Sequence, residues 1–388
     1  MANMIDYILW RGGLLFSQVP LGEVDALILS YLVYMPFDGI VPSDFDASVS
    51  FGDALRELLA RHEAGELPLA FSPKEDKRLL EAAAGSCRFA ALRACGFVNR
   101  FDREEEEQFC AMTLLCPDGT AVCAFRGTDR TVVGWKEDFN MTFCGVVPAQ
   151  RSAIHYLRGA AAAIGRPLVL CGHSTGGNLA AYAAIFSGEE MQERIWCVYN
   201  FDGPGFNEEV IASQEFHKVD MRIRVFVPKS SVVGVLLWHS EPTTVIESES
   251  VGVLQHLPYH WQVMGGRLVP ADGLTGDSRL TDATLKRWLQ SLAPELRRRV
   301  IDGIYGVLNV SDGPRIADLF EPRNALAILR AAGAMDEETR AALVEAFRLL
   351  GEALKETVPD FIDETTDALF LKAAKGKEVR NTEDENDE

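Results

Sequence analysis

The chain has 388 residues, 47% of them hydrophobic, which is enough for one large domain with appendages or for two modest domains. Its 38 Lys and Arg against 57 Asp and Glu give a formal charge of −19. That balance argues against nucleic acid as a partner and against docking on anionic lipid by charge alone, because both kinds of binding need cationic side chains.

The first third of the chain changes from a helical to a strand-like pattern. Apolar residues recur at helical spacing over 24–35 and 47–63, so we predict an N-terminal helical segment, 1–75, packed on the core. A further helix is expected near 77–86. The run 109–127 then has two apolar stretches around a Pro-Asp-Gly turn, which predicts a hairpin at the start of the core, 76–274.

From about residue 150 the pattern alternates between helices and short apolar strands. We predict strands at 167–172, 195–201 and 222–228, with helices at 153–164 and 177–188 and a short one near 207–216. Uncharged strands of this length between helices are typical of a parallel sheet that is covered on both faces.

The C-terminal third is predicted to be helical over 275–375, with a helix capped by Thr281 and another beginning at about 336. The polar, acidic stretch 376–388 predicts a disordered tail. No run reaches the roughly 18 uncharged apolar residues of a membrane helix, and the first residues lack the pattern of a secretory signal. We therefore expect a soluble, cytoplasmic protein of bacterial style, with its eight cysteines reduced and mostly buried.

The clearest motif is the run Gly172-His173-Ser174-Thr175-Gly176, which matches G-x-S-x-G. An apolar strand precedes it and a helix of small residues follows, as in the turn that presents a nucleophilic serine. Glycine is needed at both ends, because a side chain there would collide with the neighbouring strand or helix. A phosphate-binding loop is disfavoured, since no Gly-Lys-Ser/Thr follows.

A serine needs a base, normally histidine, and in this kind of site the order along the chain is serine, acid, histidine. Among the downstream histidines, His217 comes before the last predicted strand, which is too early. His256 follows that strand in a loop and is our preferred base, with His239 and His260 as alternatives.

The orienting acid is less clear. The usual place for it is after the strand 222–228, but Lys229, Ser230 and Ser231 stand there. Asp202 ends the preceding predicted strand and is our first choice, although it could be a turn-capping residue. Glu241, Glu247 and a Ser–His dyad without a carboxylate remain open.

The oxyanion hole requires two backbone donors. The N–H of Thr175 lies at a helix N-terminus, where negative charge is stabilised. Thr128, in the turn after the strand that ends at Phe125, can supply the second N–H and its hydroxyl. Asp138 could pair with Arg126 to brace this loop, and Trp135 lies within it.

Together these segments resemble known lipases. The run 125–139 is similar to the oxyanion segment of class 3 lipases, and 172–177 to their G-H-S-x-G-G turn. The segments 6–16, 24–34, 200–206 and 227–237, with Gln255-His256 and Trp261, resemble a bacterial lipase-like family of unknown function over about residues 4–310.

The resemblance implies an α/β-hydrolase fold with a mainly parallel central sheet, Ser174 and His256 in a triad, and Thr128 and Thr175 at the oxyanion hole. Class 3 lipases carry an Asp at the position of Ser231, whereas pancreatic-type lipases place the acid one strand earlier, which favours Asp202. These residues predict a serine hydrolase that cleaves a carboxylic ester or lipid without a metal or organic cofactor.

Three other functions remain open on the same machinery: a thioesterase, a peptidase or an acyltransferase. A catalytically inactive binding protein is a further alternative, supported by the missing acid at position 231. The apolar run 232–238 could line an acyl pocket or simply pack in the core.

Overall fold

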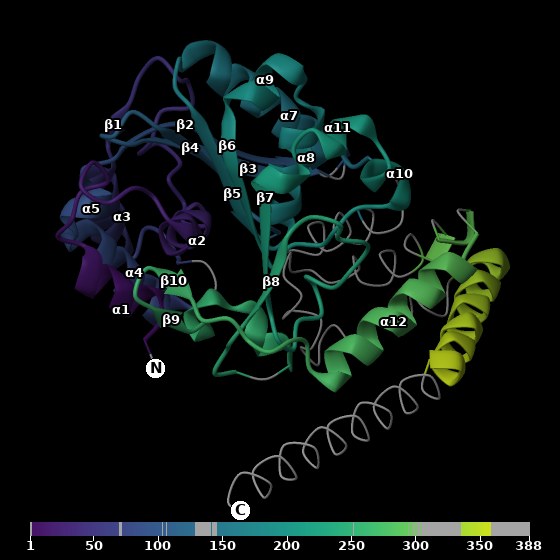
Figure 1. The fold of residues 1–388 in the computed structure, drawn as a ribbon. Helices are drawn as coiled ribbons and strands as arrows, with labels where there is room; N and C mark the ends of the chain where they lie inside the picture. The colour runs from purple at the N-terminus through teal and green to yellow at the C-terminus, as the bar shows by residue number, and fades with distance from the viewer. Residues whose placement is uncertain are drawn as a thin grey trace, which may run out of the picture.

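The computed structural model describes residues 2–69, 72–102, 104–105, 107–128, 141, 146–250, 252–293, 295–297, 299–300, 303 and 335–357. These residues form one large sheet whose strands lie side by side in chain order (Figure 1). The strands are β1 (Val49–Ser50), β2 (Arg93–Asp102), β3 (Glu107–Leu115), β4 (Ala121–Phe125), β5 (Leu168–His173), β6 (Ile195–Phe201), β7 (Ile223–Pro228) and β8 (Thr243–Ile246). A small antiparallel pair consists of β9 (Val263–Met264) and β10 (Arg267–Leu268).

The sheet is antiparallel from β1 to β4 and parallel from β4 to β8. The predicted hairpin is β3 and β4, and the three predicted parallel strands coincide with β5, β6 and β7 to within a residue or two. Strand β8 was not predicted, so β7 is not the last strand. Its sequence, Thr-Thr-Val-Ile, is partly exposed at the sheet edge and lacks the apolar run that marks a central strand.

The α-helices with labels are α1 (Met4–Arg11), α2 (Glu23–Leu32), α3 (Phe51–Glu63), α4 (Pro73–Gly85), α5 (Cys87–Ala90), α7 (Pro148–Ala163), α8 (Thr175–Phe186), α9 (Glu189–Arg194), α10 (Glu208–Ile211), α11 (Gln214–His217) and α12 (Gly276–Ser291). Short 3-10 helices are η1 (Asp220–Arg222), η2 (Gly252–His256) and η3 (Pro258–His260). Helix α12 begins five residues before the predicted cap, and the Thr281 hydroxyl donates within the helix to the Asp277 carbonyl (2.8 Å).

Helices cover both faces of the parallel strands. Helix α2 packs against β5 on one face, while α7 and α8 cover the other, so that every residue of β4 and β5 is buried (Figure 1). A separate apolar core lies on each side of the sheet. This mainly parallel sheet with flanking helices is the predicted α/β-hydrolase fold.

A buried ion pair ties α2 to the rest of the N-terminal region. The guanidinium of Arg88 donates to both carboxylate oxygens of Asp25 at 2.7 Å, and the two side chains are 0% and 1% exposed. Arg88 also donates to three backbone carbonyls and lies 3.9 Å from the ring centroid of Phe16. A buried charge is tolerated only when it is paired in this way, so the pair holds α2 in place.

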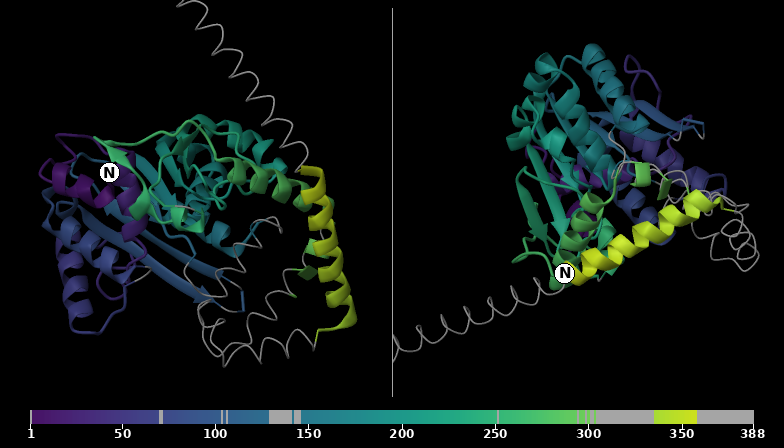
Figure 2. Two further views of the ribbon diagram at one scale, coloured as in Figure 1. Left: turned by 90° about the horizontal axis from the view of Figure 1, so that it is seen from below. Right: turned by 90° about the vertical axis from the view of Figure 1, so that its right-hand side faces the viewer.

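The C-terminal helices form a third, smaller apolar cluster, which includes Leu292 and Ala346. The indole N–H of Trp288 in α12 donates to the Ala346 carbonyl (2.8 Å) in the helix at 337–357. That second helix, yellow in Figure 2, stands clear of the helices that flank the sheet. The start of α12 contacts the core through the Ser278 hydroxyl, which donates to the Ser231 carbonyl (2.6 Å).

Within the described residues, no helix is long and apolar enough to cross a membrane. Seven of the cysteines are free thiols, most of them buried. Burial raises the pKa of the Cys116 and Cys123 thiols to about 12, so these two stay protonated and unreactive at neutral pH. Cys144 and the predicted tail at 376–388 lie outside the described residues.

Candidate active site

Ser174 occupies a sharp turn between β5 and α8. Its backbone has φ +59° and ψ −139°, a conformation that non-glycine residues rarely adopt. The Ser174 N–H donates to the carbonyl of Phe201 at the end of β6 (2.8 Å), which holds the turn against the next strand. The residue is 9% exposed. The strained backbone of this turn therefore places Ser174 at the carboxyl edge of the sheet.

The glycines on either side of Ser174 allow this turn to pack closely. A Cβ on Gly172 would lie 2.0 Å from the Gly176 carbonyl oxygen, and a Cβ on Gly176 would lie 2.2 Å from the Phe125 carbonyl oxygen. Both distances are far below van der Waals contact, and both obstacles are backbone atoms that cannot move aside. Glycine is therefore required at each position, as the motif predicted.

Thr128 and Thr175 meet beside this turn. Their hydroxyl oxygens are 2.9 Å apart. Thr175 is the first residue of α8, at the end of the helix where negative charge is stabilised. The segment 126–128, called the oxyanion loop below because an oxyanion donor is predicted in it, is held by a hydrogen bond from the Gly127 N–H to the Tyr34 hydroxyl (3.1 Å). Trp135 and Asp138 lie outside the described residues, and so does the predicted pairing of Asp138 with Arg126.

His256 and Asp202 are hydrogen-bonded to each other. The distance from His256 Nδ1 to Asp202 Oδ2 is 2.7 Å, and the two side chains are 26% and 1% exposed. Asp202 directly follows β6, and its backbone has a φ of +54°, in the left-handed region. The contact joins residues 54 positions apart in the sequence.

The second carboxylate oxygen of Asp202 accepts two further hydrogen bonds. The Ser231 hydroxyl donates to Oδ1 at 2.5 Å, and the Gly234 N–H donates to it at 3.1 Å. Ser231 is the position at which class 3 lipases carry an acid. Here its hydroxyl instead stabilises the charge of a carboxylate that comes from the neighbouring strand.

The alternative histidines and acids are engaged elsewhere. His239 Nδ1 lies 2.8 Å from Glu241 Oε1, and Lys229 Nζ lies 2.6 Å from Glu247 Oε2. Burial raises the pKa of Glu241, but the hydrogen bond and charge of His239 outweigh this effect and leave that pKa below its usual value. His260 lies in η3, after His256. Two of the candidates therefore form a separate pair of their own.

His173 has a contact that the sequence analysis missed. Its Nε2 is 2.8 Å from the His256 carbonyl oxygen, and its Nδ1 is 3.2 Å from the Tyr34 hydroxyl. Since a carbonyl only accepts, we assign the proton of His173 to Nε2. Burial, and then the His256 imidazole with its ring centre 4.6 Å away, lower the pKa of His173 well below its usual value. His173 is therefore neutral at physiological pH.

Tyr34 and His173 link three parts of the site. Tyr34 follows α2, contacts the oxyanion loop and reaches His173, which in turn holds the backbone of His256. The sequence shows little sign of these contacts. Tyr34 is one of many apolar residues in a helical pattern, and His173 stands out only as part of the G-x-S-x-G motif. The structure shows that the N-terminal helical segment reaches the candidate site.

The loop that carries His256 is fixed by its neighbours. The Gln255 side chain accepts from the Ser230 N–H (3.0 Å) and donates to the Ser250 carbonyl (2.7 Å). The indole N–H of the fully buried Trp261 donates to the Gln255 carbonyl (2.6 Å). Gln255 and Trp261 belong to the segments on which the resemblance rests. They hold the imidazole against the carboxylate.

No group of three or more His, Cys, Asp or Glu side chains that could hold a metal ion occurs among the described residues. His173, which precedes Ser174 in the chain, has its ring centre 4.6 Å from that of His256, and His256 is hydrogen-bonded to Asp202. The candidate groups at this edge of the sheet are one hydroxyl, one imidazole, one carboxylate and backbone N–H groups. That set suits nucleophilic attack on a carbonyl carbon with proton transfer to a base.

The chain was compared with known proteins. The family model described as Mbeg1-like matches residues 83–306. No curated protein matches the chain. Among solved structures, the M37 lipase is 14% identical, with 55% of this chain and 70% of that chain covered and a TM-score of 0.35. A fungal lipase is 13% identical, with 65% and 87% covered and a TM-score of 0.36. The Rhizomucor miehei lipase in its propeptide complex is 14% identical, with 61% and 76% covered and a TM-score of 0.32.

Proposed function

We propose that this chain, which belongs to the Mbeg1-like family, is a serine hydrolase that cleaves carboxylic esters through an acyl-enzyme. Ser174 is the nucleophile, His256 the base and Asp202 the orienting acid. The observation that carries the proposal is the 2.7 Å hydrogen bond between His256 Nδ1 and the buried Asp202 carboxylate. That bond leaves Nε2 of His256 as the nitrogen that accepts a proton.

The proposed reaction has two halves. In the first, Ser174 Oγ attacks the acyl carbonyl carbon while His256 Nε2 takes the hydroxyl proton, and Asp202 stabilises the resulting imidazolium. The tetrahedral intermediate then collapses, and His256 returns the proton to the leaving alcohol. In the second half, His256 deprotonates a water that attacks the acyl group on Ser174, which releases the carboxylic acid and restores the serine.

The backbone N–H groups of Thr128 and Thr175 are the proposed donors to the oxyanion. The contact between their hydroxyls brings the oxyanion loop against the N-terminus of α8. A preorganised donor of this kind contributes about 10²- to 10³-fold to the rate. The Gly127 N–H is already occupied by the Tyr34 hydroxyl, so Thr128 is the next donor along this loop.

A fluorophosphonate probe, which reacts only with an activated serine, tests the proposal. We expect rapid labelling of the wild type and none of Ser174→Ala. Ser291→Ala, which removes an exposed serine at the end of α12, serves as the matched control and should label like the wild type. Labelling that is equal in the wild type and in Ser174→Ala, or absent from both, would contradict the proposed nucleophile.

Hydrolysis of nitrophenyl butyrate tests the acid. Asp202→Asn should keep the fold but favour the wrong imidazole tautomer, and kcat should fall by about four orders of magnitude. If Asp202→Asn keeps more than a tenth of the wild-type rate, His256 is oriented by another group or the reaction does not use it.

A further inference from the structure

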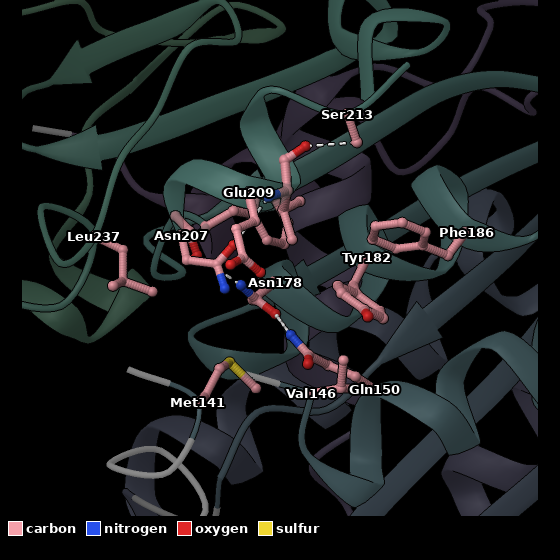
Figure 3. Close-up of a pocket in the computed structure, with 13 residues that line it drawn as sticks. Met141, Val146, Gln150, Asn178, Tyr182, Phe186, Asn207, Glu209, Ser213 and Leu237 are labelled. Atoms are coloured by element: carbon pink, nitrogen blue, oxygen red, sulfur yellow. Dashed lines mark hydrogen bonds between the residues drawn. The ribbon is translucent and has the colours of Figure 1, made fainter. Parts of the chain in front are cut away.

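A pocket of about 300 Å³ lies beside α8, and no step proposed above uses it (Figure 3). Tyr182 and Phe186 form one side of it and Leu237 stands on the opposite side, with Asn178 between them in the view of Figure 3. The volume lies at the lower end of the range of small-molecule sites, which is roughly 300–1,000 Å³.

The pocket lies along the helix that follows Ser174, although Ser174 itself is not among its lining residues. Asn178, Tyr182 and Phe186 follow one another at i+4 spacing along α8, so they form a single stripe on the helix. Asn178 stands in the first turn of α8, four residues after Ser174, and Gly203 packs against the backbone of both: a Cβ on Gly203 would lie 2.4 Å from the Ser174 carbonyl oxygen and 3.0 Å from the Asn178 nitrogen. At a rise of 1.5 Å per residue, the stripe from Asn178 to Phe186 runs for about 12 Å.

The loops that carry the other site residues also line the pocket. Gly205 and Phe206 follow Asp202 by a few residues, and Leu237 belongs to the segment that contacts Asp202 through Gly234. The segment 203–206 crosses α8 closely, because the Asn178 side-chain amide donates to the Gly205 carbonyl (2.9 Å). The pocket is thus lined by residues from the same two loops that carry Asp202 and Gly234.

Four of the polar side chains that line the pocket are engaged with one another or with the backbone: Gln150, Asn178, Asn207 and Ser213. Asn178 Oδ1 accepts from the Gln150 amide (2.9 Å), as Figure 3 shows. The side-chain oxygen of Asn207 accepts from the Val210 N–H (2.9 Å), and the Ser213 hydroxyl donates to the backbone carbonyl of Val210 (2.6 Å). Apart from Tyr182 and Glu209, the rest of the lining consists of glycine and apolar residues, and the exposed carboxylate of Glu209 would disfavour an anion here.

We propose that this pocket takes the acyl chain of the ester and sets the preference for medium-length chains. The proposal rests on the proposed function of Ser174. A cavity of roughly 150 Å³ holds one six-carbon benzene ring. Twice that volume accommodates a chain of roughly eight to twelve carbons, so the preferred substrates are esters of medium-chain fatty acids.

A chain-length series of nitrophenyl esters, from acetate to dodecanoate, tests the assignment. In the wild type, kcat/KM should rise by about fourfold for each methylene that enters the pocket, with a maximum near decanoate. Val210→Trp fills the pocket from its half-buried lining position. It should lower kcat/KM for decanoate at least 30-fold, while the acetate value stays within about twofold. Ala212→Trp, exposed and outside the lining, is the matched control and should leave the whole profile unchanged.

Binding of 1-decanol to Ser174→Ala, measured by calorimetry, separates this proposal from the proposed function. Decanol is neutral and needs no catalysis, so it should bind Ser174→Ala and fail to bind the double variant that also carries Val210→Trp. Decanol binding with this pattern in a protein that hydrolyses no ester would support the pocket while refuting the hydrolase. A chain-length profile that is identical in the wild type and in Val210→Trp would overturn the pocket assignment.

Discussion

Lowering the pH from 7.5 to 5.5 should destabilise the protein through one buried imidazole. His173 is 3% exposed and has both ring nitrogens engaged, with Nε2 at the His256 carbonyl and Nδ1 at the Tyr34 hydroxyl. A proton added to Nδ1 would place a charge in a buried position and remove one of the two acceptors of the Tyr34 hydroxyl, the other being the His173 carbonyl at 3.2 Å. The folded protein therefore keeps His173 neutral under conditions in which the unfolded chain protonates it.

The size of the effect follows from linkage. The pKa of His173 is lowered well below its unfolded value of 6.5, so below pH 6.5 the unfolded state binds more protons than the folded state. The free energy of unfolding therefore falls as the pH falls through this range, by up to about 1.4 kcal/mol per pH unit. Between pH 7.5 and 5.5, His173 alone should cost about 1.4 kcal/mol.

Urea unfolding at the two pH values measures this cost. His173→Gln keeps an amide that can donate to the His256 carbonyl but cannot be protonated, so its loss of stability on acidification should be smaller than that of the wild type by about 1.4 kcal/mol. His217→Gln, which alters a largely exposed histidine, is the control and should retain the wild-type pH dependence. If His173→Gln and the wild type lose the same stability between pH 7.5 and 5.5, His173 is not the neutral buried group described above.

Three further variants test two hydrogen bonds at the candidate site and the buried ion pair that holds α2. Ser231→Ala removes a hydrogen bond to the Asp202 carboxylate, and a bond to a charged group is worth about 1.5–3 kcal/mol. The variant should therefore lower kcat for nitrophenyl butyrate by roughly 10- to 100-fold, with little change in KM. An unchanged kcat would contradict this role of Ser231. Arg88→Met leaves Asp25 buried without its partner and should lower the free energy of unfolding in urea by about 3–5 kcal/mol; a loss below about 1 kcal/mol would show that the pair contributes little. Tyr34→Phe leaves the buried Gly127 N–H without its acceptor. It should lower the free energy of unfolding by about 1–3 kcal/mol, which scanning calorimetry would detect as a lower melting temperature. A variant that melts like the wild type would refute this role of Tyr34.

The parts of the fold and the site that depend on local sequence were predictable. A strand, a glycine turn and a small-residue helix place Ser174, and all three lie within a few residues of it in the sequence. Asp202 is the first choice for the acid from its position at the end of a buried strand, since the carboxyl ends of parallel strands meet at one edge of the sheet. The structure brings this residue to His256.

The parts that depend on distant contacts were not predictable. Nothing near His239 indicates that it pairs with Glu241 rather than joining the site, because both are polar residues in an irregular segment. Tyr34 and His173 are 139 residues apart, and neither shows a pattern that a hydrogen bond would impose on the sequence. The edge strand β8 lacks the continuous apolar run of a strand that is buried on both faces.

The left-handed backbone at Asp202 limits which residues can replace it during evolution. At a φ of +54°, Asp, Asn and Gly are tolerated, whereas longer or β-branched residues are strained. Glutamate is therefore a poor substitute for Asp202, although it carries the same charge. Under the proposed function, relatives of this chain without hydrolytic activity should most often carry Asn or Gly at this position, whereas relatives with that activity should keep Asp.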